Sequence, residues 1–471
     1  MLGLDGPVTG PELLVELDRS GDLPLHEQLE RALRENIRRG RLPAGTRLPS
    51  TRGLATELGI SRGVVTEAYG QLSAEGYLET RQGAAVRVAR AARAAVPRAP
   101  ARSLLPSFPY HFHPGLPDLA GFPRDRWLRS LRAALGQSPL DAVGYGDPRG
   151  VPRLRETLAD YLGRVRGTAA DPENMLVCTG FMQGFSILCR WLYGQGVEAI
   201  AMEDPGWHMH RLIAEQAGVR TIPVGVDERG LDVQALAASG ARAVLVTPAH
   251  QFPTGVVLDG GRRRELRDWA RDGGLIIEDD YDAEHRYDRP PVPALRSALP
   301  GQVCYTGSVS KLLAPALRTG WLLVPAGYHD AIVAAKREAD LGNAVLPQLV
   351  LAELMASGEL ERHLRLLRKR HVRRRDSMIS AIRAHLPQAR VHGAAAGLHL
   401  TLTFDALPPR TGLDVDLAAA ALRHGVKVQP LSWHSQRPHQ PGLVLGYAAR
   451  TPAEINEGIA VIGSVLRRQP G

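Results

Sequence analysis

The N-terminal region opens with an apolar pattern that is typical of a surface helix. In LHEQLERALRENIRR, residues 25–39, apolar side chains recur at every fourth position: Leu25, Leu29, Leu33 and Ile37. Such a spacing places them along one stripe of a helix. Two shorter helical patterns follow, TRGLATELG and RGVVTEAYGQLSAEG. Ser61, at the junction between them, suits a helix N-cap.

The stretch YLETRQGAAVRVA then alternates apolar and polar residues around Gln82 and Gly83. This alternation predicts a small β-hairpin. A helix, a helix-turn-helix and a hairpin, in that order, indicate a winged-helix domain over residues 12–87. Residues 88–111 are mostly Ala, Arg and Pro with little periodicity, which predicts an extended, partly disordered linker.

From residue 112 to about 465 the pattern changes. Short β-branched runs such as AVLVT, GLIIEDD and TGWLLV alternate with longer helical patterns such as VPRLRETLADYLGRV. This alternation is typical of βαβ units around a mostly parallel sheet flanked by helices, an α/β fold. At 471 residues the chain is long enough for about three packing units, and we expect a smaller α+β subdomain at about 350–465.

Charge is concentrated near the N-terminus. The formal net charge is +9, and between Arg38 and Arg102 we count twelve arginines against four glutamates, a net +8. A basic winged helix is suited to DNA, because a helix N-terminus enters the major groove while arginines hold phosphates. The candidate contacts are Arg52, Arg62, Gly63, Thr66 and, at the wing tip, Gly83. The alternative is a solvated face of an ordinary helical domain.

A second basic stretch, RHLRLLRKRHVRRR from Arg362 to Arg375, contains regularly placed leucines. We interpret it as an amphipathic helix with a solvated face. The three cysteines lack metal-ligand spacing, and no stretch of 18 apolar residues occurs. We therefore expect a cytoplasmic protein with no metal and no membrane partner.

Lysine is rare: only four of the 58 basic residues are lysines. Lys311 lies in VCYTGSVSKLLAPALRTGW, three residues after Ser308 and seven before Arg318. A lysine can form a Schiff base whereas an arginine cannot, and a hydroxyl with a guanidinium suits a phosphate. The alternative is a surface lysine after a strand.

Upstream residues complete a site of this kind. Asp279, at the end of the strand GLIIEDD, could bind a protonated pyridine nitrogen, and Tyr281 could donate to a ring hydroxyl. The turn at Gly180 leads into a helix whose first amides, of Phe181 and Met182, could bind an anion, and Trp207 could stack on a ring. Together these features predict a pyridoxal 5′-phosphate (PLP) site. The alternatives are a solvated strand end or a cation site for the carboxylates, and a core position for Trp207.

Both halves resemble known families. Residues 25–79 resemble the GntR-type winged helix, and TPAHQFPTG, EDDYDAEHRY and SVSKLLAPALRTGW resemble fold type I aminotransferases. The combination resembles the MocR/GabR family of transcriptional regulators over about residues 12–465. The resemblance implies that Lys311 forms the Schiff base, that Ser310 joins Ser308 and Arg318 at the phosphate, and that Tyr145 reaches the phosphate of a neighbouring subunit in a homodimer.

The sequence also departs from these families. Phe181 stands where relatives often carry a small polar residue, and Gly63 stands where many carry a larger polar one. Phe252 replaces the ring-contacting asparagine of free aminotransferases, so His250 or Gln251 is a candidate substitute. Val444 occupies the usual place of the carboxylate-binding arginine, for which the candidate substitutes are Arg211, Arg437 and Arg450.

We therefore expect a bacterial regulator that binds double-stranded operator DNA, and is nucleoid-associated when bound to it. Its aminotransferase-like domain would bind PLP and sense an amine or amino acid effector, or PLP itself. We expect no physiological turnover. The alternative is a working aminotransferase with a DNA tether.

Overall fold

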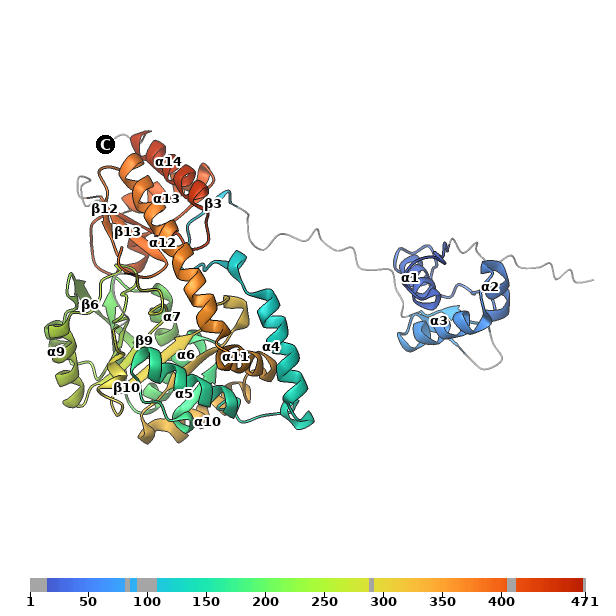
Figure 1. Ribbon diagram of the computed structural model, residues 1–471, viewed down its shortest axis with the longest axis horizontal. Coiled ribbons are helices and arrows are strands. Elements are labelled where there is room, and N and C mark those ends of the chain that lie inside the picture. Colours follow the sequence, from blue (N-terminus) through green and yellow to red (C-terminus); the bar gives the residue numbers. More distant parts are fainter. Residues whose placement is uncertain (1–14, 81–84, 91–107, 288–291, 405–411, 469–471) are drawn as a thin grey trace, which may run out of the picture. The chain divides into compact units, whose positions relative to one another are not determined.

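The computed structural model describes residues 15–80, 85–90, 108–287, 292–404 and 412–468. The chain divides into two compact units at Pro106 and Ser107 (Figure 1). Within the described ranges, no helix is long and apolar enough to cross a membrane. Each unit has its own apolar core and is described separately.

The N-terminal unit is a winged helix. Its elements are α1 (Leu25–Arg38), α2 (Thr51–Leu58), α3 (Arg62–Ala74), β1 (Leu78–Glu79) and β2 (Arg87–Val88). The predicted stripe of α1 is buried at Leu29, Leu33 and Ile37 and packs on α3. The two strands pair antiparallel, which confirms the hairpin. The tip at residues 81–84 lies outside the described residues.

Side chains cap both helices of the helix-turn-helix. The hydroxyl of Ser50 accepts a hydrogen bond from the Gly53 amide at 3.0 Å, and that of Ser61 accepts one from the Val64 amide at 3.4 Å. These caps satisfy amides that lack a partner within the helix. Gly59 ends α2 with a φ of +63°, in the left-handed region where glycine is favoured. The N-cap predicted at Ser61 is confirmed.

The second unit is built on an eight-stranded sheet. Its order is β4 (Met175–Cys178), β11 (Gly320–Leu323), β10 (Val303–Ser308), β9 (Leu275–Asp279), β8 (Ala243–Val246), β5 (Ala199–Asp204), β6 (Arg220–Asp227) and β7 (Gly230–Leu231). The pairs among β10, β9, β8, β5 and β6 are parallel, whereas β11 and β7 run antiparallel to their neighbours. A mostly parallel sheet was predicted, and it is confirmed.

Helices cover both faces of this sheet, so its strands are buried on both sides. One face carries α5 (Pro152–Arg166), α8 (Val233–Ala238), α9 (Gly260–Arg271) and α11 (Val345–Ala356). The other carries α6 (Phe181–Gly194), α7 (His208–Gln216) and α10 (His329–Asp340). Helix α4 (Arg124–Gln137) packs on α11. Short 3-10 turns lie at residues 119–121, 140–143, 172–174, 295–297, 315–317, 326–328 and 431–434.

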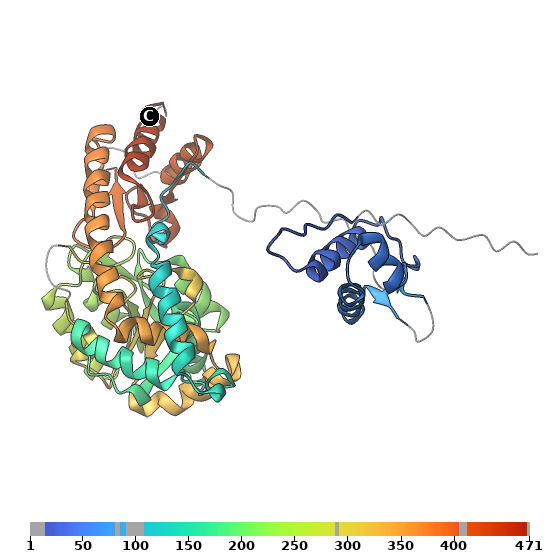
Figure 2. The same cartoon turned by 45° about the vertical axis from the view of Figure 1, so that its right-hand side comes forward.

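A smaller subdomain follows, connected by the long helix α12 (Glu359–His385). Both views show α12 running from the helices of the large sheet to the smaller sheet (Figures 1 and 2). That sheet has the order β12 (Arg390–His392), β13 (His399–Thr403), β16 (Gly442–Gly446) and β15 (Gln429–Pro430). The remaining helices are α13 (Leu413–Arg423) and α14 (Pro452–Arg468).

Both ends of the expected linker lie in strands. Val88 belongs to β2, and β3 (Tyr110–His111) pairs in parallel with β14 (Val426–Lys427) of the smaller subdomain. Phe112, which follows β3, is buried in the core of that subdomain. Residues 91–107 lie outside the described residues, so the linker prediction there stays a prediction.

Candidate functional site

The chemistry-bearing residues of the second unit lie at the carboxyl ends of its strands. Gly180 follows β4, Trp207 follows β5, His250 follows β8 and Lys311 follows β10, while Asp279 ends β9. The carboxyl ends of parallel strands meet at one edge of a sheet, the usual ligand site of open α/β folds. The sheet thus brings together residues that are far apart in the sequence.

Lys311 lies in a turn and points its amine at the start of the domain. Its Nζ atom donates a hydrogen bond to the Gly115 carbonyl oxygen at 2.5 Å. Burial lowers the pKa of Lys311, while the carboxylates of Asp282 and Asp279 oppose that shift. A lowered pKa increases the fraction of neutral amine, the form that attacks a carbonyl. A Cβ at Gly115 would come within 3.0 Å of Nζ, so the bare backbone there leaves room for the amine.

The Asp279 carboxylate is buried, and neighbouring groups compensate its negative charge poorly. Burial, and then the like charges of Asp280 and Asp282, raise its pKa well above the usual value. The Thr306 hydroxyl donates to Oδ1 of Asp279 at 3.4 Å, and Nε2 of His210 lies 3.7 Å from Oδ2. That Nε2 atom is buried and has no hydrogen-bond partner among the described residues. A cationic pyridine nitrogen at this carboxylate would offset the cost of its charge, so the site fits PLP.

The adjacent Asp280 differs from Asp279. Its Oδ2 atom lies 2.6 Å from Nε of Arg166 and accepts a hydrogen bond from the Tyr305 hydroxyl at 2.6 Å. This pairing satisfies its charge within the protein. Of the two neighbouring carboxylates, Asp279 is therefore the one available to a ligand.

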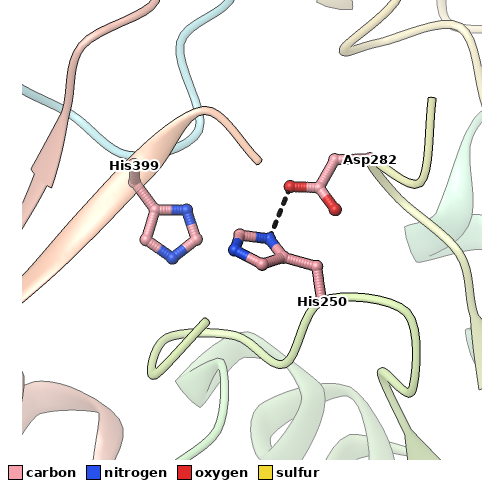
Figure 3. Close-up of side chains that lie close together, drawn as sticks. All are labelled: His250, Asp282 and His399. Carbon is pink, nitrogen blue, oxygen red and sulfur yellow. Dashed lines mark hydrogen bonds and ion pairs between the residues drawn. The ribbon is translucent and has the colours of Figure 1, made fainter. Parts of the chain in front are cut away.

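Tyr281 contacts a buried histidine. Its hydroxyl lies 3.0 Å from Nδ1 of His250, and that nitrogen lies 2.8 Å from Oδ2 of Asp282 (Figure 3). Burial, with the charges of Asp282 and Asp279, raises the pKa of Tyr281 well above its usual value. The phenol therefore stays protonated and remains a hydrogen-bond donor at neutral pH.

A phosphate-sized anion would lie at the start of α6. Gly180 has a φ of +80° and caps the helix without a side chain, so the first amides, including those of Phe181 and Met182, face outward. Nη2 of Arg318 donates to the Thr179 carbonyl, and a Cβ at Gly180 would lie 3.2 Å from that nitrogen. Ser308 ends β10, and Ser310 lies two residues further, both partly exposed. The predicted phosphate ligands at Gly180 and Arg318 therefore lie together.

Trp207 lies directly before α7. Its ring contacts that of His210, with centroids 5.1 Å apart and planes at 86°, and His210 leads to Asp279. The ring of Trp207 also lines a pocket with Arg211, Phe252 and Glu203, among other residues. This position against His210, which in turn contacts Asp279, and outside the apolar cores favours the ring-stacking role over the core alternative.

The three candidate arginines differ in their surroundings. Arg450 is paired with Glu454 at 3.2 Å, and the exposed Arg437 donates to the Pro223 carbonyl at 2.7 Å. Arg211 has only long contacts, 3.5 and 3.4 Å, to the carbonyls of Gly206 and His434, and it lines the pocket beside Trp207. Arg211 is therefore the one best placed for an effector carboxylate.

The two departures at aromatic residues have structural explanations. Phe181 stacks on Phe185, with centroids 5.3 Å apart, and contacts the His210 ring at 5.0 Å. Phe252 packs against the rings of His399 and His434, with centroids 5.1 and 5.0 Å away. Both phenylalanines therefore replace polar contacts by packing around buried histidines.

Tyr145 is 98% exposed. A large aromatic side chain left this exposed often marks an interaction surface. This exposure is compatible with the proposed contact to a neighbouring subunit.

The predicted DNA contacts lie on one exposed edge of the helix-turn-helix. Arg52 is the second residue of α2, and Arg62, Gly63 and Thr66 lie in the first turns of α3; all four are exposed. Nε of Arg62 donates to the Thr51 hydroxyl at 3.3 Å, which joins the two helices. Gly83 lies outside the described residues.

The basic stretch of residues 362–375 lies within α12, as predicted. Leu367 is buried, and Leu366 is 53% exposed. Arg374 is buried and lies 3.0 Å from Asp118, whereas Arg365 and Lys369 are exposed.

Comparison with known proteins agrees with both halves. Residues 25–88 match the family model for bacterial regulatory proteins of the gntR family, and residues 124–462 match that for aminotransferase class I and II. The chain is 35% identical to the probable rhizopine catabolism regulatory protein MocR of Rhizobium meliloti, over 96% of both chains. It is 34% identical to the pyridoxine biosynthesis transcriptional regulator PdxR of Corynebacterium glutamicum, over 84% of this chain and 86% of that one.

Solved structures resemble the second unit. The kynurenine aminotransferase of Pyrococcus horikoshii, solved with PMP, is 25% identical, with a TM-score of 0.69, and the match covers 76% of this chain and 90% of that one. An archaeal alanine:glyoxylate aminotransferase, with 24% identity and a TM-score of 0.70 over 78% and 92% of the two chains, shares the fold.

A winged helix joined to a fold type I aminotransferase domain defines a class of DNA-binding transcriptional regulators whose enzyme-like domain is linked to PLP. The chain belongs to the MocR-type regulators within that class.

Sequence reasoning missed one residue of the candidate site, His210. It is the third residue after Trp207, on the first turn of α7, and its contact with Asp279 depends on β5 and β9 ending at one edge. The spacing of Trp207 and His210, which brings both side chains to one side of a helix start, was the available signal.

Proposed function

We propose that this regulator binds PLP at Lys311 and couples the occupancy of that site to DNA binding. The supporting observation is the convergence of Lys311, Asp279 and Gly180 from the ends of three strands, β10, β9 and β4. When bound, PLP supplies an aldehyde that reacts reversibly with amines. An amine or amino acid effector, or PLP itself, is therefore the ligand class that this site fits.

The protein's own residues have separate roles. Lys311 supplies the amine that holds the cofactor, Asp279 pairs with the pyridine nitrogen, and Trp207 covers one ring face. The phosphate is held by the α6 amides together with Arg318, Ser308 and Ser310. Arg211 is our candidate for an effector carboxylate. Tyr145 would complete the neighbouring subunit's phosphate site, which requires a homodimer.

Regulation follows if the ligand binds two conformations unequally. An effector that removes Lys311 from the cofactor would alter contacts between the large sheet and the smaller subdomain. The linker that leads to the winged helix enters the second unit at β3, which pairs with β14 of that same subdomain. We place the protein in the bacterial cytoplasm, on its operator DNA.

The test is to sequence genomic fragments retained by the full-length, PLP-loaded protein. One enriched fragment is then titrated with protein in the presence of a panel of amines and amino acids. We expect discrete operator sites and at least one ligand that changes their Kd. Retention of all fragments alike would contradict the regulator function, and rapid transamination without an effect on DNA would favour the tethered-enzyme alternative.

A further inference from the structure

A buried histidine–carboxylate pair lies beside the expected cofactor position. His250 and Asp282 are each about 1% exposed at their side chains, and Nδ1 of His250 lies 2.8 Å from Oδ2 of Asp282. The hydroxyl of Tyr281 lies 3.0 Å from the same nitrogen. Figure 3 shows that His250 and Asp282 come from separate segments, with His399 on the opposite side of the His250 ring.

The surrounding backbone holds the His250 ring tightly. A Cβ on Gly397 would lie 2.0 Å from Cε1 of His250, and a Cβ on Gly255 would lie 3.2 Å from its Nε2. Both glycines have positive φ values, +82° and +73°. Only glycine allows such an approach at that backbone geometry, so the ring orientation is fixed by two separate loops.

His250 and Gln251 are the two candidates to replace the missing asparagine. The side chain of Gln251 already makes hydrogen bonds within its own loop and to a neighbouring one. Its Nε2 atom donates to the Pro205 and Phe252 carbonyls at 2.8 and 2.6 Å, and its Oε1 accepts from the Thr254 hydroxyl at 2.7 Å. These bonds support the loop. His250, in contrast, contacts Tyr281, which is expected at the cofactor.

The contacts around Asp282 define a competition for one proton. A carboxylate only accepts hydrogen bonds, so we assign the His250 proton to Nδ1, which then donates to Asp282. The Tyr281 hydroxyl lies 3.0 Å from that same Nδ1, and a hydrogen bond with Asp282 is among the causes that raise its pKa. The hydroxyl has a single proton. Without His250, the phenol would keep donating its hydrogen bond to Asp282, because the carboxylate would otherwise be a buried unpaired charge. With His250 present, its Nδ1–H still donates to Asp282 when the Tyr281 hydroxyl turns to donate to the cofactor.

We propose that the His250–Asp282 pair is a positioning device that frees the Tyr281 hydroxyl to donate to the ring oxygen of PLP. This inference rests on the proposed function. It assigns to His250, acting through Tyr281, the effect that an asparagine has directly in free aminotransferases. Other ionisable groups facing the pair are Asp279, His285 and Tyr287 on the segment of Asp282, Lys311 after β10, His399 on β13 and Tyr447 after β16.

A cation site at the same residues is the less favoured interpretation. A ring nitrogen of His250, an oxygen of Asp282 and a ring nitrogen of His399 lie within 4.8 Å of one another. However, the first two are bonded to each other, and Nε2 of His399 is 3.1 Å from the Pro253 carbonyl, to which it can donate. A bound cation would have to displace these bonds.

The experiment uses the full-length PLP-loaded protein and five variants: H250L, H250N, Y281F, D282N and the double variant H250L/Y281F. Two quantities are measured: the pKa of the cofactor's visible absorption band and the Kd for PLP. Without His250 the phenol donates to Asp282, so the ring oxygen of PLP lacks a donor that stabilises its negative charge. We expect H250L to raise the band pKa by about one unit and weaken PLP binding about tenfold.

Y281F should produce the same changes, and adding H250L to Y281F should change nothing further, because the histidine acts through the phenol. H250N, which keeps an N–H donor near the Nδ1 position, should stay close to the wild type. D282N should move the band pKa in the opposite direction, because it removes an anion from beside the cofactor's cationic form and frees the phenol.

Additive effects of H250L and Y281F, or wild-type values in H250L, would overturn the positioning role. If EDTA or added Zn²⁺ changed the band pKa or the Kd for PLP of the wild type, the cation site would be supported and the positioning role overturned. Failure of the wild-type protein to bind PLP would instead contradict the proposed function. Far-UV circular dichroism and thermal unfolding check that each variant folds. If H250L does not fold, H250A replaces it, with the same expected changes.

Discussion

The Nζ atom of Lys311 donates to the carbonyl oxygen of Gly115 at 2.5 Å, although the two residues lie 196 positions apart. Gly115 lies between β3 and α4, so a segment from the start of the second unit contacts the turn that follows β10. The amine is thereby held at the site while its pKa is lowered by burial. A lysine held in this way is ready to react with an aldehyde.

The first prediction concerns this lysine. The purified protein should be yellow, and reduction with borohydride should attach the cofactor covalently to Lys311. K311A should lose the attachment and release its colour on dialysis, because no other amine is held at Asp279. K427R, at a partly exposed lysine, is the control and should behave as the wild type. Peptide mass spectrometry locates the attachment, and cofactor retained irreversibly by K311A would contradict the assignment.

The elements were predicted correctly from the sequence because they depend on local patterns, and the proposed site residues were chosen from patterns of the same kind. The α1 stripe, the Ser61 N-cap and the strand that ends at Asp279 follow from spacing and residue type. Lys311 was identified because lysine is rare in this chain. Patterns of this kind are local, and they need no knowledge of which strands are neighbours.

The histidine contacts could not be predicted in the same way. His210 contacts Asp279 only because β5 and β9 end at one edge of the sheet, and His250 contacts Asp282, 32 positions away, because β8 and β9 are neighbours. Their partners depend on the strand order, which the sequence does not specify. Which of His250 and Gln251 replaces the asparagine could likewise be decided only from the structure, which shows the hydrogen bonds that hold the Gln251 side chain in its loop.

The second prediction separates a regulator from an enzyme. With amino acids and keto acids the PLP-loaded protein should show only slow half-reactions, well below the ~10 per second of an ordinary enzyme. Phe252 packs on His399 and His434 where free enzymes place a ring contact. Stopped-flow absorbance measures the rate, with a free aminotransferase as the control. Sustained turnover near 10 per second would favour the enzyme alternative.

The third prediction tests the partner contact of Tyr145, which is 98% exposed. Y145A and K311A homodimers should each bind PLP weakly. Mixing the two variants under exchange conditions should restore tight binding in half of the sites of each heterodimer, because one site then receives both intact residues. Titration with PLP measures the number of tight sites. An unchanged number after mixing, with exchange verified by tagged subunits, would contradict a contribution from the partner.

The fourth prediction concerns pH. His371 is fully buried, neither ring nitrogen has a partner among the described residues, and burial, followed by His285, lowers its pKa to about 2. Below the unfolded pKa of about 6.5 the unfolded chain binds a proton that the folded chain does not. This histidine therefore destabilises the fold as pH falls, by about 1.4 kcal/mol for each pH unit between about 6.5 and 2.

H371L should remove that dependence. Calorimetric unfolding at pH 7 and pH 5 should show a smaller loss of stability in H371L than in the wild type, by about 2 kcal/mol. Glu203, whose pKa burial raises to about 7, acts in the opposite direction but equally in both proteins. H439L, at a partly exposed loop position, is the control. Equal losses in H371L and the wild type would mean that His371 does not resist protonation in the fold.

The fifth prediction concerns the helix-turn-helix. Arg62 begins α3 and is exposed, with its Nε atom donating to the Thr51 hydroxyl at 3.3 Å, whereas Arg52 is the second residue of α2. If Arg62 contacts a base edge, R62A should cost about 1–3 kcal/mol and relax specificity at one operator position. If Arg52 holds a phosphate, R52A should weaken binding to all sequences alike and lower the salt slope by about one.

These two substitutions are compared by competition binding to a library of operator variants at several salt concentrations. The Ser50 and Ser61 caps remain in both variants, so the helices should be unchanged, and thermal unfolding of the winged helix checks this. R31A, at an exposed position on α1 outside the helix-turn-helix, is the control and should bind as the wild type. Identical specificity profiles for R62A and the wild type would assign Arg62 to the backbone, and a position-specific change in R52A would reverse the two roles.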